Sequence, residues 1–530
     1  MQKRMAAKDT LKEMLGELPL TAELYWHLRQ RGKVTGDMSL KKLAASLPEW
    51  RRQTAASPYL QQPGKRILIF STLRYWTHYS ALLGLGLAGL GHKVTLAYLP
   101  YGNWRANTPR FDLRRQNLYV QDVLKTAQPF LNIASFYDAP GSPELPPELQ
   151  EKVALVSYQD TQYTRQVEEI DRQDPLYLLR MQRNTQAAAA ALSWLKANQP
   201  DVVIVPNGSI LEFGAVYQAA RYLNFPAITY EFGEQRRRIW FALNEEVMQQ
   251  DTTRMWAACK DQPFSDEQLG QLRELFDSRQ KASLWENFSR RWQNVPTQGG
   301  EQVRAQLGLD ERPVALLAAN VIGDSLTLGR QVFSQSMTEW LVKTLLVFKD
   351  NPAVQLIVRI HPGERYTKGP SIADVVRGVL PELPEHIHLV AFDAPVNTYD
   401  LVQIADVGLV YTTTVGLEMA MSGVPVIAAG HTHYRRRGFT LDADSWEAYF
   451  QILETVLGNS ASLRLDQDKL RQAWHYAYCF FFEYPMVFPW HLQHLEKDTQ
   501  EWPLSRVLSP EGQAEFSQTF QHLTWEDRQW

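Results

Sequence analysis

The sequence predicts an α/β protein with two doubly wound, Rossmann-like domains that follow one another along the chain. Short, wholly apolar runs alternate with helical stretches between residues 66 and 232, and again between residues 312 and 430. Such runs are typical of strands buried on both faces, and their alternation with helices indicates a parallel sheet. At 530 residues, 45% of them hydrophobic, the chain has room for two or three globular domains.

The first domain is expected over residues 61–300, after a helical N-terminal extension at residues 1–60 that ends in the linker "SPYLQQPGK". The runs "RILIFST" and "KVTLAYLP", separated by a helical stretch, predict a βαβ unit. A helix-rich insert is expected at about 105–198. Two further strands, "DVVIVP" and "PAITYEF", follow this insert with a helix between them.

The second domain is expected over residues 301–460, and helices over residues 461–530. Its predicted strands are "RPVALLAAN", "AVQLIVRI", "HIHLVAF", "DVGLVYT" and "VPVIAAG", each separated from the next by a helical stretch. Unbroken alternation of this kind predicts an open, parallel, doubly wound sheet.

Composition excludes several classes of protein. A net charge of -3 gives no overall electrostatic reason to expect nucleic-acid binding. Cys259 and Cys479 lie far apart and outside any CxxC motif, which fits a reducing compartment. The first twenty residues read as an amphipathic helix, and no stretch reaches the roughly 18–20 apolar residues of a membrane span. We expect a cytoplasmic protein, with peripheral association at the inner face of the membrane left open.

Four motifs that suggest a bound cofactor or metal fail on their context. "GLGLAG" at residues 84–89 matches a dinucleotide-binding pattern, but it lies inside a helix rather than at the turn that opens one. Asp442 and Asp444 form a DxD pair that the start of the next helix explains. The HxH pairs at residues 386–388 and 431–433 lack a third ligand at a recognisable spacing. No metal and no cofactor are therefore expected.

Polar side chains gather where strands of the second domain end, which is where open α/β sheets bind ligands. Hydroxyl and backbone N–H groups at a helix start suit an anion, which a nearby arginine or histidine would reinforce. Taken singly, each group has an ordinary explanation as a helix cap, a turn or a solvated charge. Together they predict a phosphate-and-ribose pocket made of Asn320, Gly323, Asp324, Arg359, His361, Thr412, Thr413, Thr414 and Glu418.

The stretches "RIHPGE", "NTYDLVQIADVGLVYTTTVGLEMAMSGVPVIAAG" and "HTHYRRRGFTLD" resemble the capsule-polysaccharide-synthesis glycosyltransferases of bacteria. These belong to the GT-B enzymes with a His-Pro motif, which include Kdo transferases, sialyltransferases and teichoic-acid polymerases. The resemblance implies a GT-B fold and a nucleotide-sugar donor, CMP-Kdo-like or another. It also implies that His361 and Thr412 to Thr414 contact the donor's nucleotide and phosphate.

The first domain is expected to bind the acceptor and to supply the base that deprotonates its hydroxyl group. Glu231 and Glu234 directly follow a strand and are the preferred candidates, ahead of His78; pairing with the nearby arginines is their ordinary alternative. Two arginine triplets and two histidines are expected to form a basic rim for a nucleotide-sugar or an anionic glycan. These are Arg236, Arg237, Arg238, Arg435, Arg436, Arg437, His431 and His433.

The predicted function is therefore metal-independent transfer of a sugar from a nucleotide-sugar to a glycan or glycolipid acceptor in surface polysaccharide synthesis. Two alternatives stay open. One is a nucleotide-sugar 2-epimerase of the same fold, which acts on the donor alone. The other is a non-catalytic subunit of a polysaccharide assembly.

Overall fold

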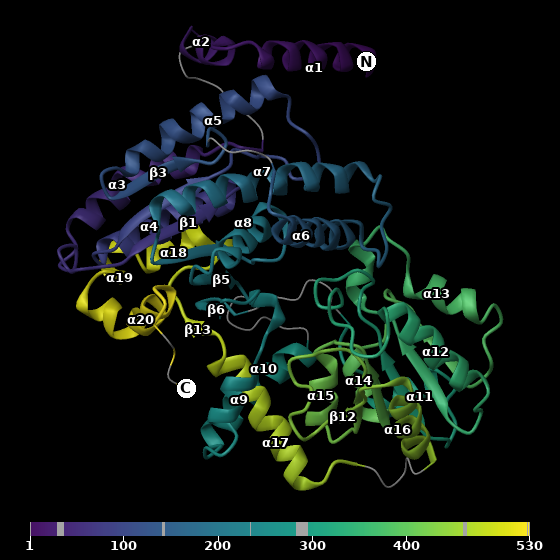
Figure 1. Cartoon of the computed structure of the whole chain (residues 1–530). Helices are drawn as coiled ribbons and strands as arrows, with labels where there is room; N and C mark the ends of the chain where they lie inside the picture. The colour runs from purple at the N-terminus through teal and green to yellow at the C-terminus, as the bar shows by residue number, and fades with distance from the viewer. Residues whose placement is uncertain are drawn as a thin grey trace. The chain divides into compact units, whose positions relative to one another are not determined.

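The computed structural model describes residues 2–28, 37–139, 144–233, 235–281, 295–458, 464–526, 528 and 530. The chain forms two compact units, each with its own sheet (Figure 1). The first contains residues 1–161, 171–248 and 486–529, and the second contains residues 162–170, 249–485 and 530. No helix in the described part of the chain is long and apolar enough to cross a membrane.

The first unit is built on a seven-stranded sheet with the order β13-β6-β5-β4-β1-β2-β3. Strands β1 to β5 run parallel, whereas β6 and β13 are antiparallel to their neighbours. The central strands are almost fully buried, as their continuous apolar sequences predict. The strands are β1 (Arg66–Ser71), β2 (Lys93–Tyr98), β3 (Leu131–Ser135), β4 (Val202–Pro206), β5 (Ala227–Glu231), β6 (Arg238–Leu243) and β13 (Met486–Val487).

Helices from both ends of the chain cover this sheet. Figure 1 shows the C-terminal helices beside α3 and α4, and the core they share is continuous. The N-terminal helices are α1 (Gln2–Glu17), α2 (Thr21–Leu28), α3 (Lys41–Ala55), α4 (Arg74–Gly89), α5 (Arg110–Leu124), α6 (Pro147–Arg165), α7 (Pro175–Asn198) and α8 (Leu211–Tyr222), with 3-10 turns η1 (Lys125–Ala127) and η2 (Val247–Gln249). The C-terminal ones are η6 (Leu492–His494), α18 (Leu495–Glu501), α19 (Leu504–Val507) and α20 (Pro510–Leu523).

The second unit is built on a six-stranded, wholly parallel sheet with the order β12-β11-β10-β7-β8-β9. Four of its strands are completely buried and the other two lie at the edges. The strands are β7 (Val314–Ala318), β8 (Gln355–Arg359), β9 (Ile387–Val390), β10 (Val407–Val410), β11 (Val426–Ala428) and β12 (Leu441–Asp442).

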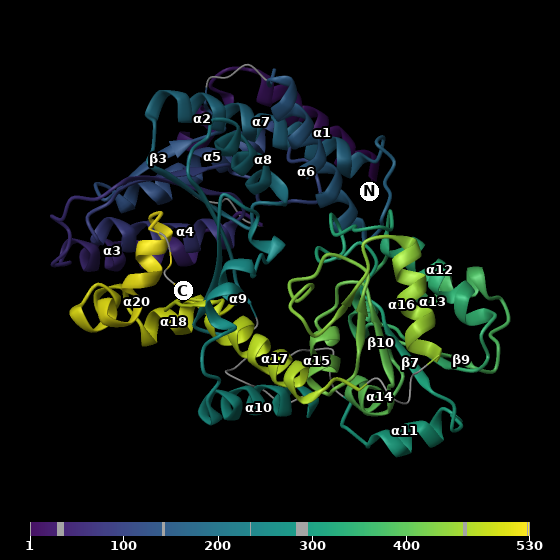
Figure 2. The ribbon, with the colours of Figure 1, turned by 60° about the horizontal axis from the view of Figure 1, so that its bottom comes forward.

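Helices α12, α13 and α16 pack with this sheet in one hydrophobic core (Figure 2). The second unit contains α9 (Thr253–Cys259), α10 (Asp266–Gln280), α11 (Gly300–Gln306), α12 (Met337–Lys349), α13 (Ile372–Val379), α14 (Thr398–Ile404), α15 (Val415–Met421), α16 (Trp446–Gly458) and α17 (Gln467–Tyr478). It also contains the 3-10 turn η3 (Pro362–Tyr366) and the π-helical turn η5 (Cys479–Glu483).

The fold class predicted from the sequence is confirmed: both sheets are of the doubly wound α/β kind, as in the GT-B fold. The structure adds four strands that the sequence did not reveal, β3, β6, β12 and β13. All four lie at or near the edges of their sheets. Edge strands need not be continuously apolar, so their sequences carry a weaker signal.

Candidate functional site

The topological switch point of the second sheet lies between β7 and β10. From β7 the chain winds outward through β8 to β9, and from β10 it winds the other way through β11 to β12. The register places Ala318, Arg359, Val390, Val410 and Ala428 in one row across the sheet. The loops that follow these residues therefore share one edge, where sheets of this type bind ligands.

Asn320 and Thr412 meet at this switch point. Asn320 follows β7, Thr412 follows β10, and the backbone N–H of Thr412 donates a hydrogen bond to Asn320 Oδ1 at 3.2 Å. Both residues are buried. Thr412 Oγ1 is also buried, and no described residue hydrogen bonds to it. A buried hydroxyl without a partner costs free energy, so this oxygen is suited to a ligand.

Thr413 and Thr414 lead from β10 into α15. The Thr413 carbonyl accepts a hydrogen bond from the Tyr434 hydroxyl at 2.6 Å. Thr414 directly precedes the helix, and its side chain makes no capping bond among the described residues. The next turn is close-packed, because a Cβ at Gly416 would lie 2.3 Å from the Tyr434 hydroxyl oxygen. Tyr434 therefore holds the threonine segment at the sheet edge.

His361 follows β8 and caps the short helix η3. Its Nδ1 accepts a hydrogen bond from the backbone N–H of Gly363 at 3.0 Å. Burial, and secondarily the charge of Arg359, lowers the pKa of His361 to about 4. The ring is therefore neutral at pH 7 with its proton on Nε2, because Nδ1 acts as an acceptor. Nε2–H is thus a donor of fixed orientation.

Arg359, the last residue of β8, is buried and bound to backbone carbonyls. Its guanidinium donates to the carbonyls of Ala391 at 2.5 Å and Val396 at 3.3 Å, and to Thr398 Oγ1 at 3.3 Å. Burial lowers its pKa to about 10, so it stays charged at pH 7. These contacts hold the loop between β9 and α14. Glu364, also buried, accepts a hydrogen bond from the backbone N–H of Ile372 at 2.9 Å and so connects η3 to α13.

The turn that follows β7 is occupied by the chain itself. Gly323 has a φ of +69°, and a Cβ there would lie 2.5 Å from the backbone nitrogen of Val167. The glycine thus allows the segment 162–170 to approach closely. Burial raises the pKa of Asp324, whose carboxylate accepts a hydrogen bond from the Ser325 hydroxyl at 3.2 Å. Both residues shape a turn that a neighbouring backbone covers.

Glu418 forms a buried ion pair that the sequence did not predict. Its carboxylate lies 3.3 Å from the guanidinium of Arg279 on α10, and both side chains are under 5% exposed. The two residues lie far apart in the sequence, so no local pattern links them. The pair gives Glu418 a partner within the protein, on the helix that Thr414 precedes.

The arginine triplet after β11 is largely bonded within its own segment. Arg435 is buried and donates to the carbonyl of Ala428 at 2.7 Å and to Asp444 at 3.0 Å. Arg436 pairs with the same Asp444 at 2.7 Å. Arg437 donates to the hydroxyls of Thr252 and Thr253, both at 3.1 Å. The DxD aspartates therefore serve this turn, and Ser445 rather than Asp444 caps the helix that follows.

Histidines 431 and 433 lie beside a cation that the sequence analysis missed. The backbone N–H of His431 donates to the carbonyl of Arg330 at 2.8 Å. Burial is the main cause that lowers the pKa of both histidines, and the positive charge of Arg330 is the second. His433 stacks on Phe480 at 3.7 Å, and its Nδ1 lies 3.0 Å from the Tyr476 hydroxyl. Arg330 is itself buried and is held by Gln249 at 2.8 Å. A single arginine in a polar loop gave no pattern to detect.

In the first unit, Glu231 ends β5 in a defined setting. Its carboxylate accepts hydrogen bonds from Asn207 Nδ2 at 2.9 Å and from the backbone N–H of Phe232 at 3.0 Å. Burial raises its pKa. His78 lies in α4 against Trp50, with a ring separation of 5.4 Å, and burial lowers its pKa to about 4. Glu234 lies outside the described residues.

Two arginines of the other triplet are also paired. Arg236 donates to Asp498 at 2.6 Å and to Glu501 at 2.8 Å, and Arg237 pairs with Glu515. Arg238 is the first residue of β6. These partners come from the C-terminal helices, so the triplet fixes that segment to the first sheet. In the described part of the chain, no three His, Cys, Asp or Glu side chains come together as metal ligands.

Residues 293–458 match the family described as capsule polysaccharide biosynthesis protein. Similar solved structures include a Thermosulfurimonas dismutans KpsC, titled beta Kdo 2,4 transferase, at 16% identity over 55% of this chain and 82% of that one, with a TM-score of 0.33. Others are a putative UDP-N-acetylglucosamine 2-epimerase from Listeria monocytogenes (12% identity, 78% and 91% covered, TM-score 0.26) and starch synthase IV from Arabidopsis thaliana (11%, 82% and 77%, TM-score 0.30).

A search of curated proteins found none that matches this chain. The family match lies wholly within the second unit and contains all six strands of its sheet. It therefore includes the switch point and every strand-end residue of the second sheet described above. Residues 293–458 form a domain of the capsule polysaccharide biosynthesis family.

Proposed function

We propose that this protein is a glycosyltransferase that moves a sugar from a nucleotide-sugar donor to a glycan or glycolipid acceptor in surface polysaccharide synthesis. The observation that carries the proposal is the switch point between β7 and β10. There the buried hydroxyl of Thr412, which has no hydrogen-bond partner among the described residues, lies in a family domain named for capsule polysaccharide biosynthesis. A ligand at this edge would find donors on two neighbouring strands.

The donor's phosphates would be bound by hydroxyl and backbone groups of Thr412, Thr413 and Thr414, together with His361 Nε2–H. A neutral imidazole donates a hydrogen bond without the desolvation cost of a second charge. Arg330 would supply positive charge, since it lies beside His431 at the same edge. Arg359 acts as support, because its guanidinium is bonded to the loop between β9 and α14.

Glu231 is the proposed general base. A carboxylate whose pKa is raised by burial accepts a proton more readily than an ordinary one near neutral pH. His78, with a pKa of about 4, is a weaker base and packs against Trp50. We expect Glu231→Gln to lower turnover by about 10²–10⁴-fold. Nucleotide binding should stay unchanged. Equal loss of both would instead indicate a structural role for Glu231.

A thermal-shift screen with CMP, CDP, UDP, GDP and ADP tests the proposal. The nucleotide of the donor should raise the melting temperature in proportion to the logarithm of its concentration above Kd. A shift with none of the five would contradict nucleotide binding and favour a non-catalytic role. An epimerase would convert a nucleotide-sugar without any acceptor, and product analysis of the donor alone detects that outcome.

We infer association with a membrane surface from exposed apolar side chains on α1, on α2 and on the turn between them. The first helix also carries Lys3, Arg4 and Lys8 in its sequence, which suits anionic lipid head groups. We expect the protein to sediment with phosphatidylglycerol vesicles. Less protein should sediment when three of the exposed leucines named below are changed to serine. Equal recovery of the variant would contradict this role. The exposed residues are Leu11, Met14, Leu18, Leu20, Leu24 and Leu28.

A further inference from the structure

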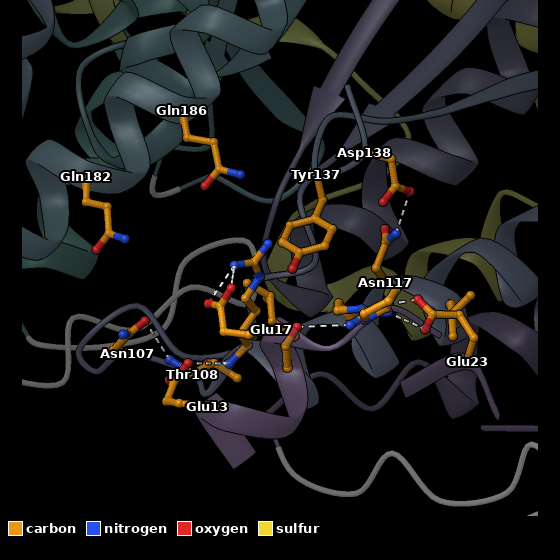
Figure 3. A pocket seen from close by; sticks show the side chains of 16 residues that line it. Glu13, Glu17, Glu23, Asn107, Thr108, Asn117, Tyr137, Asp138, Gln182 and Gln186 are labelled. Carbon is orange, nitrogen blue, oxygen red and sulfur yellow. Dashed lines mark hydrogen bonds and ion pairs between the residues drawn. The ribbon is translucent and has the colours of Figure 1, made fainter. Parts of the chain in front are cut away.

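A polar cavity of about 770 Å³ lies in the first unit, beyond the ends of β2 and β3 (Figure 3). Its walls come from α1, from the start of α2, from the loop and helix that follow β2, from the residues after β3 and from α7. This volume is in the range of pockets that enclose ligands of several hundred daltons. The functional site described above uses none of its residues.

A hydrogen-bond network fixes one wall of this cavity. Asn117 on α5 accepts hydrogen bonds from the Tyr98 hydroxyl at 2.9 Å and the Ser135 hydroxyl at 2.8 Å. Its amide nitrogen donates to Asp138 Oδ2 at 2.6 Å. Both ends of the Asn117 amide are engaged, and the residue holds the Asp138 carboxylate at the cavity, as Figure 3 shows. Asp138 is exposed, so its second oxygen is available to a ligand donor.

The opposite wall presents two side-chain amides. Gln182 and Gln186 lie one turn apart on α7 and therefore share a face of that helix. Gln186 Oε1 accepts a hydrogen bond from the Tyr101 hydroxyl at 2.9 Å, which orients its NH₂ group as a donor. Gln182 is exposed, and among the described residues it makes no hydrogen bond through its side chain.

The charge of the cavity selects among ligands. Arg110 pairs with Glu17 at 2.6 Å and Arg114 pairs with Glu23, so these four charges cancel. Glu13 and Asp138 also line the cavity, and among the described residues they accept hydrogen bonds from a backbone N–H and from an amide, not from a cationic side chain. The surplus is therefore negative. An anionic ligand would be repelled, whereas hydroxyl or ammonium donors would be attracted.

A second hollow, of about 570 Å³, adjoins the first and shares Gln182 and Gln186 with it. Apart from those two and Thr185, its lining is apolar, with Phe136 and Met181 as its largest side chains. Polar groups beside an apolar floor match a sugar, whose rings carry hydroxyl groups at the rim and C–H groups on the faces. Carboxylate oxygens accept hydrogen bonds from hydroxyl groups, and side-chain amides both accept and donate them.

We propose that this cavity binds a neutral or amino-sugar oligosaccharide, the acceptor in the reaction proposed above. That the oligosaccharide is the acceptor rests on the proposed function, whereas its binding rests on the cavity alone. The inference also limits the acceptor: the part that enters this cavity carries no carboxylate or phosphate group.

The test applies the fluorescently labelled full chain to an array of neutral, amino and acidic oligosaccharides of two to four sugars. Binding should be confined to neutral or amino members. Removing one hydrogen-bonding side chain typically costs about 1 kcal/mol, so Gln182→Ala and Asp138→Ala should each weaken binding about fivefold. Gln150→Ala, an exposed amide on α6 away from the cavity, should leave binding unchanged.

Three outcomes would overturn the inference: an array with no bound member, preferred binding of acidic members, or full binding by both cavity variants. Melting temperatures of the variants identify any loss that comes from misfolding. The nucleotide screen separates the two proposals. A chain that binds a nucleotide but no oligosaccharide refutes the cavity inference alone, and the reverse result refutes the donor site alone.

Discussion

The carboxyl edges of the two sheets use their polar residues in different ways. At the second sheet, buried arginines bind back to the protein's own carbonyls, as Arg359 does to Ala391 and Arg435 does to Ala428. At the first sheet, by contrast, Asp138 is held by a neighbouring side chain at the wall of an open cavity. The difference shows that a charged residue at a strand end can stabilise the neighbouring loops instead of binding a ligand.

This contrast decides which residues at the second edge are suited to a ligand. The charged groups there, Arg359, Arg435 and Glu418, have partners within the chain. Thr412 differs, because its buried hydroxyl has no partner among the described residues. The contrast would weaken if one of the charged groups proved to act on the ligand directly.

The largest effect is expected at the buried pair of Glu418 and Arg279. Glu418→Gln leaves the guanidinium buried without its counter-charge, and breaking such pairs typically costs about 3–5 kcal/mol. Urea unfolding should show this loss. The double variant Glu418→Leu/Arg279→Met should recover part of it, and the exposed Glu454→Gln should change little. A Glu418→Gln variant of normal stability that no longer binds nucleotide would instead support a ligand contact of Glu418 in the predicted phosphate-and-ribose pocket.

A smaller loss is expected from Arg359→Met, about 2–3 kcal/mol, because the carbonyls of Ala391 and Val396 lose their donor in a buried setting. Urea unfolding measures the change, and the exposed Arg377→Met serves as the control. If Arg359→Met unfolded like the wild type while losing nucleotide affinity, Arg359 would be a ligand contact rather than support.

The third prediction concerns pH and His361. Its folded-state pKa of about 4 lies below the ordinary value near 6.5, so the unfolded chain binds more protons between these values. The contribution to stability is therefore complete above pH 6.5 and is lost as the pH falls toward 4. His361→Asn, which can still accept from Gly363, should flatten this dependence in unfolding curves measured from pH 4 to 7. Part of the pH dependence of stability should remain in this variant, because the pKa of other buried histidines, such as His78, is also lowered. An unchanged slope would contradict the assignment.

The sequence predicted the sheet edges better than it predicted the partners of the residues on them. The apolar runs located every buried strand of the second sheet, because continuous burial requires continuous apolar sequence. The shared edge for Asn320, His361 and Thr412 then followed from topology. The ion pair of Arg279 with Glu418 did not, because it depends on the packing of two helices that are distant in the chain.

Gly323 shows the same limit. Its sequence context suggested a backbone that approaches a ligand, and the structure shows a backbone that approaches Val167. A ligand and the Val167 backbone both require a residue without a side chain at this position. A glycine in the sequence therefore cannot tell which of the two approaches it. The cavity beyond β2 and β3 was also missed, since its walls come from five separate segments without any shared motif.

The most direct test of the account is the affinity of the donor nucleotide for Thr412→Val, measured by calorimetry with the nucleotide found in the screen. Valine keeps the shape of threonine and removes only the hydroxyl group. We expect Kd to rise about tenfold, with the melting temperature of the free protein unchanged or higher, because the hydroxyl removed is buried and has no partner in the described part of the chain. The exposed Thr455→Val should bind as the wild type does. Equal affinity in Thr412→Val and wild type would contradict a donor site at the switch point between β7 and β10.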